Sequence, residues 1–172
     1  TVDAVMASAC LPTLFQAPVI DGKHYWDGGY SANPSFAPLI DRCCSTDILL
    51  IQINPLRIEH EIRSADEITD RMNELTFNAS LITQLRTIEL VNELIQRGVA
   101  QPGMKLLHLH RIDGGRRMRA FPPSTKGQVR RAMMEELAEI GRFAAGRWLR
   151  RCFGAVGTRS TIDIAYDYGN PL

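Results

Sequence analysis

Apolar residues recur at intervals of three and four along the middle of the chain, spacing that places them on one face of an α-helix. Ser64 precedes this series with Glu67 three residues later, which is the pattern of a capping box, and Gly98 follows the series as a C-terminal cap would. The pattern therefore predicts one long helix from Ser64 to Gly98. The face that we expect to be buried comprises Ile68, Met72, Leu75, Ala79, Ile82, Leu85, Ile88, Val91 and Ile95.

A second series with the same spacing predicts another long helix, from about Ser124 to Phe153, closed by Gly154. Its apolar members are Val129, Met133, Leu137, Ile140, Ala144, Trp148 and Cys152. The two helices could form a lipid-binding amphipathic pair. We favour faces that pack on a core, because apolar stripes of this kind cover the core in most globular proteins.

A continuous apolar run predicts a buried strand at Asp47–Ile53, ended by Asn54-Pro55. Such runs are typical of parallel strands covered on both faces, so this strand requires a layer of helices on each side. Lys105–His110 is a further candidate strand, and Ser160–Tyr166 is a last short one. Ser35–Asp41 is predicted to be a short helix or turn.

The first part of the chain contains one acidic residue in a setting suited to chemistry. Residues 1–10 are typical of the end of a helix, and residues 19–26 form a hairpin pattern around Asp21-Gly22. Asp27 follows directly and precedes Gly28 and Gly29. Glycines there permit positive φ and close approach of a ligand or a neighbouring loop. We therefore expect the Asp27 carboxylate at the end of a strand, on a sharp turn.

The composition is that of one globular domain or most of one, with 172 residues of which 45% are hydrophobic and 23% charged. The four cysteines show neither a disulfide framework nor the spacing of a zinc site. We expect reduced thiols, which favours a cytoplasmic compartment over a secreted effector and leaves localisation open.

Charge is divided unevenly along the chain. Residues 1–102 carry 7 Lys and Arg against 13 Asp and Glu, whereas residues 103–172 carry 13 against 6. The densest basic cluster could attract anionic lipid headgroups at about 1 kcal/mol per residue. Equally, the two halves could neutralise each other across the fold, or the cluster could be a solvated face. The cluster comprises Arg116, Arg117, Arg119, Lys126, Arg130 and Arg131.

Two histidines also invite a functional interpretation. His108 and His110 lie two residues apart on a predicted strand and therefore face the same side, where they could hold a metal. With no third ligand nearby in the sequence, we favour two structural histidines and predict no metal site.

The Asp27 stretch resembles the second catalytic block of the patatin-like phospholipases. That block has Ala-Ser-x-x-x-Pro, then a strand, then Asp-Gly-Gly, then Asn-Pro, and here the same order is kept by Ala7, Ser8, Pro12, Asp27, Gly28, Gly29, Asn33 and Pro34. Asp-Gly-Gly alone is a weak signal, because a second copy at Asp113-Gly114-Gly115 lacks these surroundings. The ordered set is what makes the resemblance specific. Residues 73–81 and 160–163 also resemble the C-terminal part of a bacterial subgroup of this family.

The resemblance implies an α/β fold with a three-layer patatin-like sheet, helices on both faces and two long helices. It also implies that Asp27 belongs to a Ser-Asp dyad that hydrolyses lipid or phospholipid esters without a cofactor, with Gly28, Gly29, Asn33 and Pro34 shaping the site. The family's Gly-rich loop and Gly-x-Ser-x-Gly nucleophile are absent from the 172 residues. We therefore expect a C-terminal portion of a larger bacterial enzyme, with residues 1–55 carrying the aspartate and residues 56–172 forming a helical portion.

This interpretation carries expectations about partners. They are the missing N-terminal segment, a peripheral membrane contact through Arg116, Arg117 and Arg119, and a homodimer as one way to complete the sheet. A catalytically inactive binding or scaffold protein is the alternative. A nucleic-acid-binding module has only the basic cluster in its favour and no recognised motif, so we expect no nucleic acid.

Overall fold

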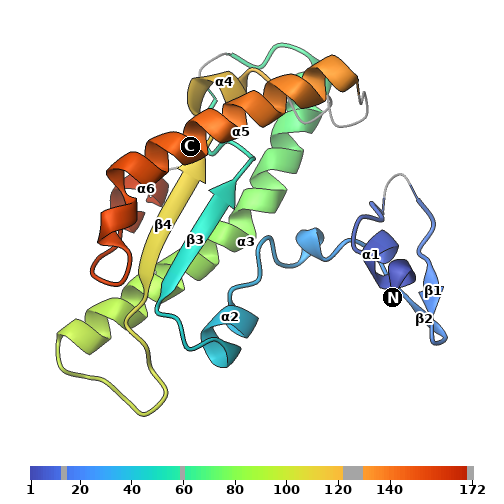
Figure 1. Cartoon of the computed structure of the whole chain (residues 1–172). Helices are drawn as coiled ribbons and strands as arrows, with labels where there is room; N and C mark the ends of the chain where they lie inside the picture. The colour runs from blue at the N-terminus through green and yellow to red at the C-terminus, as the bar shows by residue number, and fades with distance from the viewer. Residues whose placement is uncertain (13–14, 59–60, 122–129, 170–172) are drawn as a thin grey trace.

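The computed structural model describes residues 1–172 except 13–14, 59–60, 122–129 and 170–172 (Figure 1). The chain has mixed helix and strand content with two small sheets and two long helices. In order, its elements are α1 (Val2–Ala7), β1 (Val19–Ile20), β2 (Lys23–His24), the 3₁₀ turn η1 (Gly28–Tyr30), α2 (Ala37–Arg42), β3 (Asp47–Gln52), α3 (Ala65–Gln96), β4 (His108–Asp113), α4 (Gly115–Arg119), α5 (Arg131–Arg151), the 3₁₀ turn η3 (Phe153–Ala155) and α6 (Ile164–Tyr168).

The centre of the molecule is a parallel pair of strands. β3 and β4 align from Asp47 opposite His108 to Gln52 opposite Asp113, which confirms the predicted parallel strand. β4 begins three residues later than the sequence indicated, because Lys105 turns away to donate from Nζ to the carbonyls of Ile40 and Cys43, at 2.6 and 2.7 Å.

The long helix α3 connects the two strands and packs under their shared face. Its N-terminus has the predicted capping box between Ser64 and Glu67, and Gly98 follows its end with a φ of 81°. The core beneath the sheet consists of Phe36, Ile48, Leu81, Leu85, Ile88, Leu107, Leu109, Ile164 and Tyr168.

The buried face of α3 differs from the predicted one in its first half. Ile68 and Met72 are 53% and 63% exposed, whereas Glu74 and Asn78 are buried. Glu74 forms an ion pair with Arg71 at 3.1 Å. The side-chain amide of Asn78 donates to the Pro55 carbonyl at 2.8 Å. Arg71 and Asn78 both donate to backbone carbonyls of the loop after β3, so the first half of the helix turns a polar stripe toward that loop.

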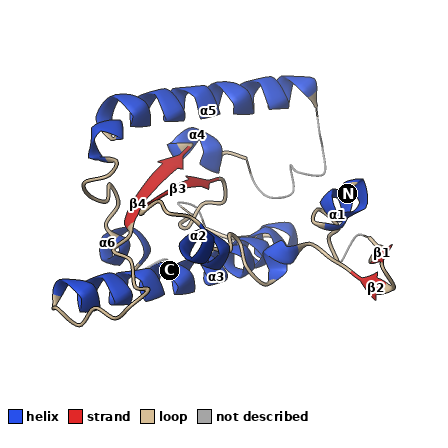
Figure 2. Ribbon diagram, turned by 60° about the horizontal axis from the view of Figure 1, so that its bottom comes forward, coloured by secondary structure: helices blue, strands red, loops and turns tan. Residues whose placement is uncertain are grey.

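The other long helix, α5, lies over the opposite face of the sheet (Figure 2). Ile140, Ala144 and Trp148 form its buried stripe, as the apolar spacing predicted. Gly114 is required at this contact, since a Cβ there would lie 2.9 Å from Cγ2 of Ile140. The start of the predicted helix lies partly outside the described residues, and α5 begins at Arg131.

The prediction that β3 is buried on both faces was wrong for this chain. Leu49 and Ile51 are 44% and 69% exposed. Helix α5 contacts β4, and among the described residues β3 pairs with no other strand, so its outer edge and part of one face stay open.

The segment predicted as a last strand is instead the approach to α6. Ser160 and Thr161 each bond once to the backbone of Leu109 at the edge of β4, at 3.0 and 2.9 Å. Asp163 then ends the extended stretch, because its carboxylate accepts from the Tyr166 amide at 2.9 Å and so caps α6.

The N-terminal residues form a small lobe beside this unit (Figure 1). Its hairpin pairs Val19 with His24 and Ile20 with Lys23, as predicted. Asp21 and Gly22 adopt φ of 49° and 74°, the left-handed conformation that a tight hairpin turn needs. No described helix of the chain is long and apolar enough to cross a membrane.

Candidate active site

Asp27 is held at both its backbone and its side chain. Its amide donates to the Cys10 carbonyl at 2.8 Å, which ties the residue to the end of α1. One carboxylate oxygen, Oδ1, accepts from the Gly29 amide at 2.8 Å and caps η1. β2 ends at His24, so the acid begins a 3₁₀ turn three residues beyond the strand and does not lie at the strand end, where the sequence placed it.

The two glycines after Asp27 have different surroundings. Neither adopts positive φ, so the expected left-handed turn is absent at these two positions. A Cβ on Gly29 would lie 3.1 Å from Asp27 Oδ1 and 3.1 Å from the Phe77 ring, whereas a Cβ on Gly28 would meet nothing within 4 Å. A glycine is therefore required at position 29, because the Phe77 ring approaches it closely. The sequence predicts a close approach of this kind at these glycines.

The neighbour that makes this approach is α3. The rings of Tyr30 and Phe77 lie 5.2 Å apart at 58°, and they join η1 to the helix. Sequence reasoning missed Phe77, because it lies 50 positions from Asp27 and off the apolar stripe assigned to the helix.

The Asn33-Pro34 element is fixed to the same helix by one side chain. Gln84 Nε2 donates to the Pro34 carbonyl at 2.7 Å, and Gln84 Oε1 accepts from the Phe36 amide at 2.9 Å. Phe36 is buried in the core, and Asn33 is half-buried. Phe77 and Gln84 are seven positions apart on α3, so both belong to the helix face that supports the Asp27 segment.

The second carboxylate oxygen of Asp27, Oδ2, accepts no hydrogen bond from any described residue. Two serine hydroxyls of the N-terminal lobe are engaged elsewhere, since Ser8 donates to the Val5 carbonyl at 2.8 Å and Ser31 donates to the Gly28 carbonyl at 3.0 Å. One oxygen is thus fixed by the backbone, and the other accepts no hydrogen bond among the described residues. Within the described part of the chain, no serine or threonine hydroxyl donates to it.

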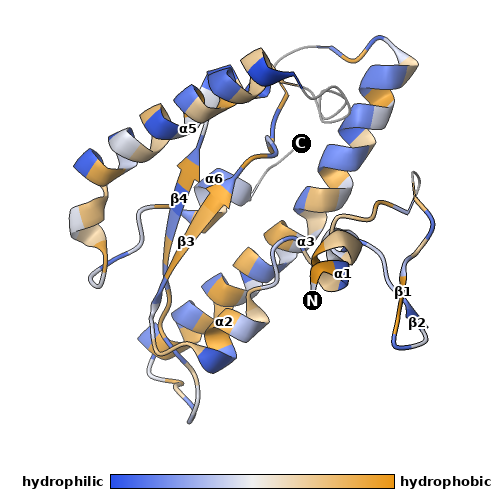
Figure 3. Cartoon of the chain, turned by 45° about the vertical axis from the view of Figure 1, so that its right-hand side comes forward, coloured by the Kyte–Doolittle hydropathy of each residue, from blue (hydrophilic) through white to orange (hydrophobic). Residues whose placement is uncertain are grey.

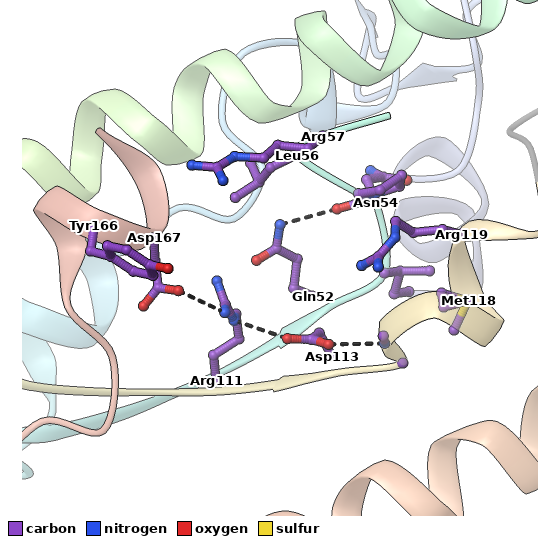
Figure 4. Close-up of a pocket in the computed structure, with 14 residues that line it drawn as sticks. Gln52, Asn54, Leu56, Arg57, Arg111, Asp113, Met118, Arg119, Tyr166 and Asp167 are labelled. Atoms are coloured by element: carbon purple, nitrogen blue, oxygen red, sulfur yellow. Dashed lines mark hydrogen bonds and ion pairs between the residues drawn. The ribbon is translucent and has the colours of Figure 1, made fainter. Parts of the chain in front are cut away.

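The second Asp-Gly-Gly copy makes the same local hydrogen bond in a different setting. Asp113 Oδ1 accepts from the Gly115 amide at 2.9 Å, at the carboxyl end of β4 (Figure 4). It borders a pocket of about 310 Å³ between the strand ends, α4 and α6. Arg111 bridges Asp113 and Asp167, each at 3.1 Å. The charged groups at the pocket floor therefore satisfy one another.

The predicted lipid-contacting arginines lie apart from Asp27. Arg116, Arg117 and Arg119 belong to α4, which both Figure 1 and Figure 2 place beside α5 and away from the hairpin. Arg119 lines the pocket at the strand ends. Lys126 lies outside the described residues, and Arg131 pairs with Glu135 at 2.8 Å. The structure thus separates these arginines from the Asp27 segment.

The two histidines of β4 turn toward one acid. His110 is almost fully buried, with Nε2 2.9 Å from Asp47 Oδ1 and Nδ1 3.0 Å from the Thr161 hydroxyl. The Gly157 amide donates to the same Asp47 oxygen at 2.8 Å. This backbone bond, together with the His110 bond, holds the pKa of Asp47 below its usual range. Among the described residues, no group of three or more His, Cys, Asp or Glu side chains is arranged to hold a metal ion.

Residues 1–40 match the family model of the patatin-like phospholipases. This confirms the resemblance over the stretch that contains Asp27, Gly28, Gly29, Asn33 and Pro34. The match suggests lipid hydrolase activity. No curated protein and no solved structure matches the chain.

Proposed function

We propose that this chain supplies the aspartate of a serine-dependent lipid acyl hydrolase, with Asp27 as the base of a Ser-Asp dyad. The carboxylate geometry carries the proposal: Oδ1 is fixed by the Gly29 amide, and Oδ2 accepts no hydrogen bond from a described residue. The patatin-like match over residues 1–40 supports it, because it covers the whole Asp27 segment. The nucleophilic serine is proposed to come from a segment outside these 172 residues.

The proposed chemistry needs a carboxylate, a serine hydroxyl, backbone amides and water. Asp27 takes the proton of the serine hydroxyl as the serine oxygen attacks the ester carbonyl carbon. Backbone amides of the serine-bearing segment stabilise the oxyanion, and the alcohol leaves with the proton. Asp27 then takes a proton from a water molecule as the water oxygen attacks the acyl carbon of the acyl-enzyme. Asp27 returns this proton to the serine oxygen as the acyl–serine bond breaks and the fatty acid is released. No cofactor takes part in these steps.

The same proposal extends to the architecture. The outer edge of β3 would pair with strands of a preceding segment of the same protein, to give the three-layer patatin-like sheet, or a homodimer would cover it. The open edge and the exposed Leu49 and Ile51 support this extension. The division into an aspartate portion, residues 1–55, and a helical portion, residues 56–172, stays a prediction. β3 and β4 pair across it.

The alternative function is a binding or scaffold protein that keeps the patatin-like segment without catalysis. It is favoured by one observation, that no described serine or threonine hydroxyl donates to Asp27. Contacts of Arg116, Arg117 and Arg119 with anionic lipid belong to either proposal, and neither involves nucleic acid.

The test compares the two Asp-Gly-Gly copies in the intact enzyme. Asp27→Asn should lower ester turnover by about 1,000-fold or more, because an amide cannot accept the serine proton. Asp113→Asn is the matched control, since Asp113 makes the same backbone hydrogen bond, 2.9 Å against 2.8 Å, at a different place. Circular dichroism checks that both variants fold. Near-normal turnover by the Asp27 variant would exclude Asp27 as the base.

A further inference from the structure

One long stretch of the chain carries only positive charge. Residues 140–162 contain five arginines and no aspartate or glutamate. All five arginines are exposed, and among the described residues none of them forms an ion pair. This stretch covers the second half of α5, η3 and the loop that follows. The arginines are Arg142, Arg147, Arg150, Arg151 and Arg159.

Large apolar side chains project from the same surface. Phe143, Leu149 and Phe153 are 60%, 55% and 59% exposed, and Val156 is exposed beside them. Their helix positions lie away from the buried stripe of Ile140, Ala144 and Trp148. Hydrophobic and hydrophilic residues accordingly alternate along the exposed part of α5 (Figure 3). We call the outward-facing residues Arg142, Phe143, Leu149, Arg150 and Phe153 the α5 outer face.

One ring contact supports this surface, and one guanidinium lies close to the helix backbone. The Phe153 ring packs edge-on against Trp148, with centroids 6.3 Å apart at 79°, and Trp148 packs in turn against His110. A Cβ on Gly146 would lie 3.3 Å from a terminal nitrogen of Arg150, so this guanidinium lies back over the glycine. The contact with Trp148 restrains the Phe153 ring, which limits the entropy that binding would cost at this position.

We propose that the α5 outer face binds the surface of an anionic lipid bilayer. Arginines beside exposed phenylalanine and leucine are typical of helices that lie in the membrane interface, where the cations meet headgroups and the apolar side chains enter the acyl boundary. The residues from 142 to 153 form about three helical turns, a length of roughly 18 Å. Charge complementarity thus identifies the partner as anionic lipid.

Nucleic acid fits this surface less well. The first half of α5 carries Glu135, Glu136 and Glu139, which would repel a polyanion that followed the helix. Phe143 and Phe153 could stack on bases, but the exposed Leu149 and Val156 beside the arginines offer neither stacking nor hydrogen bonds. A bilayer, by contrast, would contact only the second half of α5, where the exposed arginines and apolar side chains lie together.

This surface is distinct from α4, where the sequence placed the lipid-contacting arginines, and it does not depend on the chemistry of Asp27. A vesicle-binding assay can therefore fail without affecting the catalytic proposal. Asp27→Asn should bind vesicles as the wild type does, and variants of the α5 outer face should keep their turnover of a water-soluble ester.

The first experiment measures partitioning of the intact protein onto vesicles by co-sedimentation, with equal parts phosphatidylglycerol and phosphatidylcholine or with phosphatidylcholine alone. Replacing Arg142 and Arg150 by Gln should lower partitioning onto anionic vesicles on the order of 30-fold at low salt. Leu149→Ser should lower it several-fold. Ile68→Ser is the matched control, because Ile68 is 53% exposed on α3, against 55% for Leu149, and it should change nothing.

The second experiment locates the contact. Lipids brominated on the acyl chain should quench the fluorescence of the tryptophan introduced by Phe143→Trp. They should not quench that of the tryptophan introduced by Glu135→Trp, on the acidic half of the same helix. The fluorescence of Trp26 and Trp148 is subtracted with the wild-type protein.

Several results would overturn the proposal. They are absence of wild-type binding to anionic vesicles, equal binding to phosphatidylcholine alone, unchanged partitioning of the double arginine variant, and equal quenching at positions 143 and 135. Salt-dependent binding to DNA or RNA without vesicle binding would assign the surface to nucleic acid instead. Thermal unfolding confirms that each variant is folded before it is scored.

Discussion

At the scale of single residues, the reactivity proposed for Asp27 depends on a glycine that has no side chain to interfere. Gly29 lies between the Asp27 carboxylate and the Phe77 ring, and an added Cβ would lie 3.1 Å from each. One of the two neighbours must therefore move if the position is filled. Because Asp27 Oδ1 is bonded to the amide of the same residue, the carboxylate is directly affected.

We predict that Gly29→Ala lowers turnover of the intact enzyme about tenfold or more, since a shift of about 1 Å at a catalytic group can cost about 100-fold. Gly28→Ala should leave turnover within about twofold, because a Cβ there meets nothing within 4 Å and its φ is negative. Steady-state kinetics of the pair on one ester substrate measures both. Equal effects at the two glycines would contradict the assigned role of Gly29.

The local features of this segment could be predicted from sequence, because they depend on neighbouring residues. The Asp21-Gly22 turn and the sharp turn that begins at the half-buried Asp27 both follow from short-range rules. Phe77 and Gln84 could not be predicted, since they reach the segment from α3 across more than 45 positions. Asp113 shows the limit of the motif: the same three residues make the same hydrogen bond in other surroundings.

At the scale of elements, capping and charge decide where the helices and strands lie. The capping box and Gly98 predicted the ends of α3 closely. Its buried face was predicted only in the second half, because the first half buries the Arg71-Glu74 pair and Asn78, which no apolar pattern reveals. The strand expected at residues 160–166 is likewise replaced because of a polar contact, since the Asp163 side chain caps α6.

Asp47 links three elements, and this yields a pH prediction. Its carboxylate accepts from His110 on β4 and from Gly157 after α5, and it lies 3.8 Å from His108. Because these bonds lower the pKa of Asp47 in the folded state, the unfolded chain binds the proton more readily. The contribution of the Asp47 carboxylate to the free energy of unfolding is fully present above the ordinary aspartate pKa, near 3.8. This contribution is lost as the pH falls through the lower pKa that Asp47 has in the folded state.

Asp47→Asn should therefore lower the free energy of unfolding by about 1–2 kcal/mol at pH 6, and this difference from the wild type should shrink as the pH falls below about 4. Urea unfolding at a series of pH values measures it. Asp41→Asn, on the exposed side of α2, is the control and should be close to neutral. A difference independent of pH would show that packing, and not the charge, accounts for the loss.

At the scale of the whole molecule, the parallel pair β3–β4 is a sheet with an open edge. α3 and α5 cover opposite faces, yet Leu49, Ile51 and the following Ile53 remain exposed, and among the described residues β3 pairs with no strand other than β4. The sequence indicated a strand apolar throughout but could not reveal which of its faces this chain covers, because coverage depends on elements distant in sequence. An open apolar edge of this kind favours association.

We predict that the 172-residue chain alone elutes as an assembly larger than 19.3 kDa in size-exclusion chromatography with mass detection. Ile51→Lys, at a position 69% exposed, should shift it toward the monomer by placing a charge at the open edge. Leu39→Lys, 45% exposed on α2, serves as the control and should leave the assembly unchanged. A soluble, cooperatively folding monomer at all concentrations would contradict the proposed completion of the sheet.

The measurement that tests the central claim most directly is hydrolysis of p-nitrophenyl esters together with labelling by a serine-directed fluorophosphonate. It should be made on the 172-residue chain and on a longer polypeptide that includes a preceding serine-bearing segment. We predict neither turnover nor labelling for the 172 residues alone, and both for the longer polypeptide, with turnover lost in Asp27→Asn. Fluorophosphonate-sensitive turnover by the 172 residues alone would contradict the account, because it would place the nucleophile in this chain.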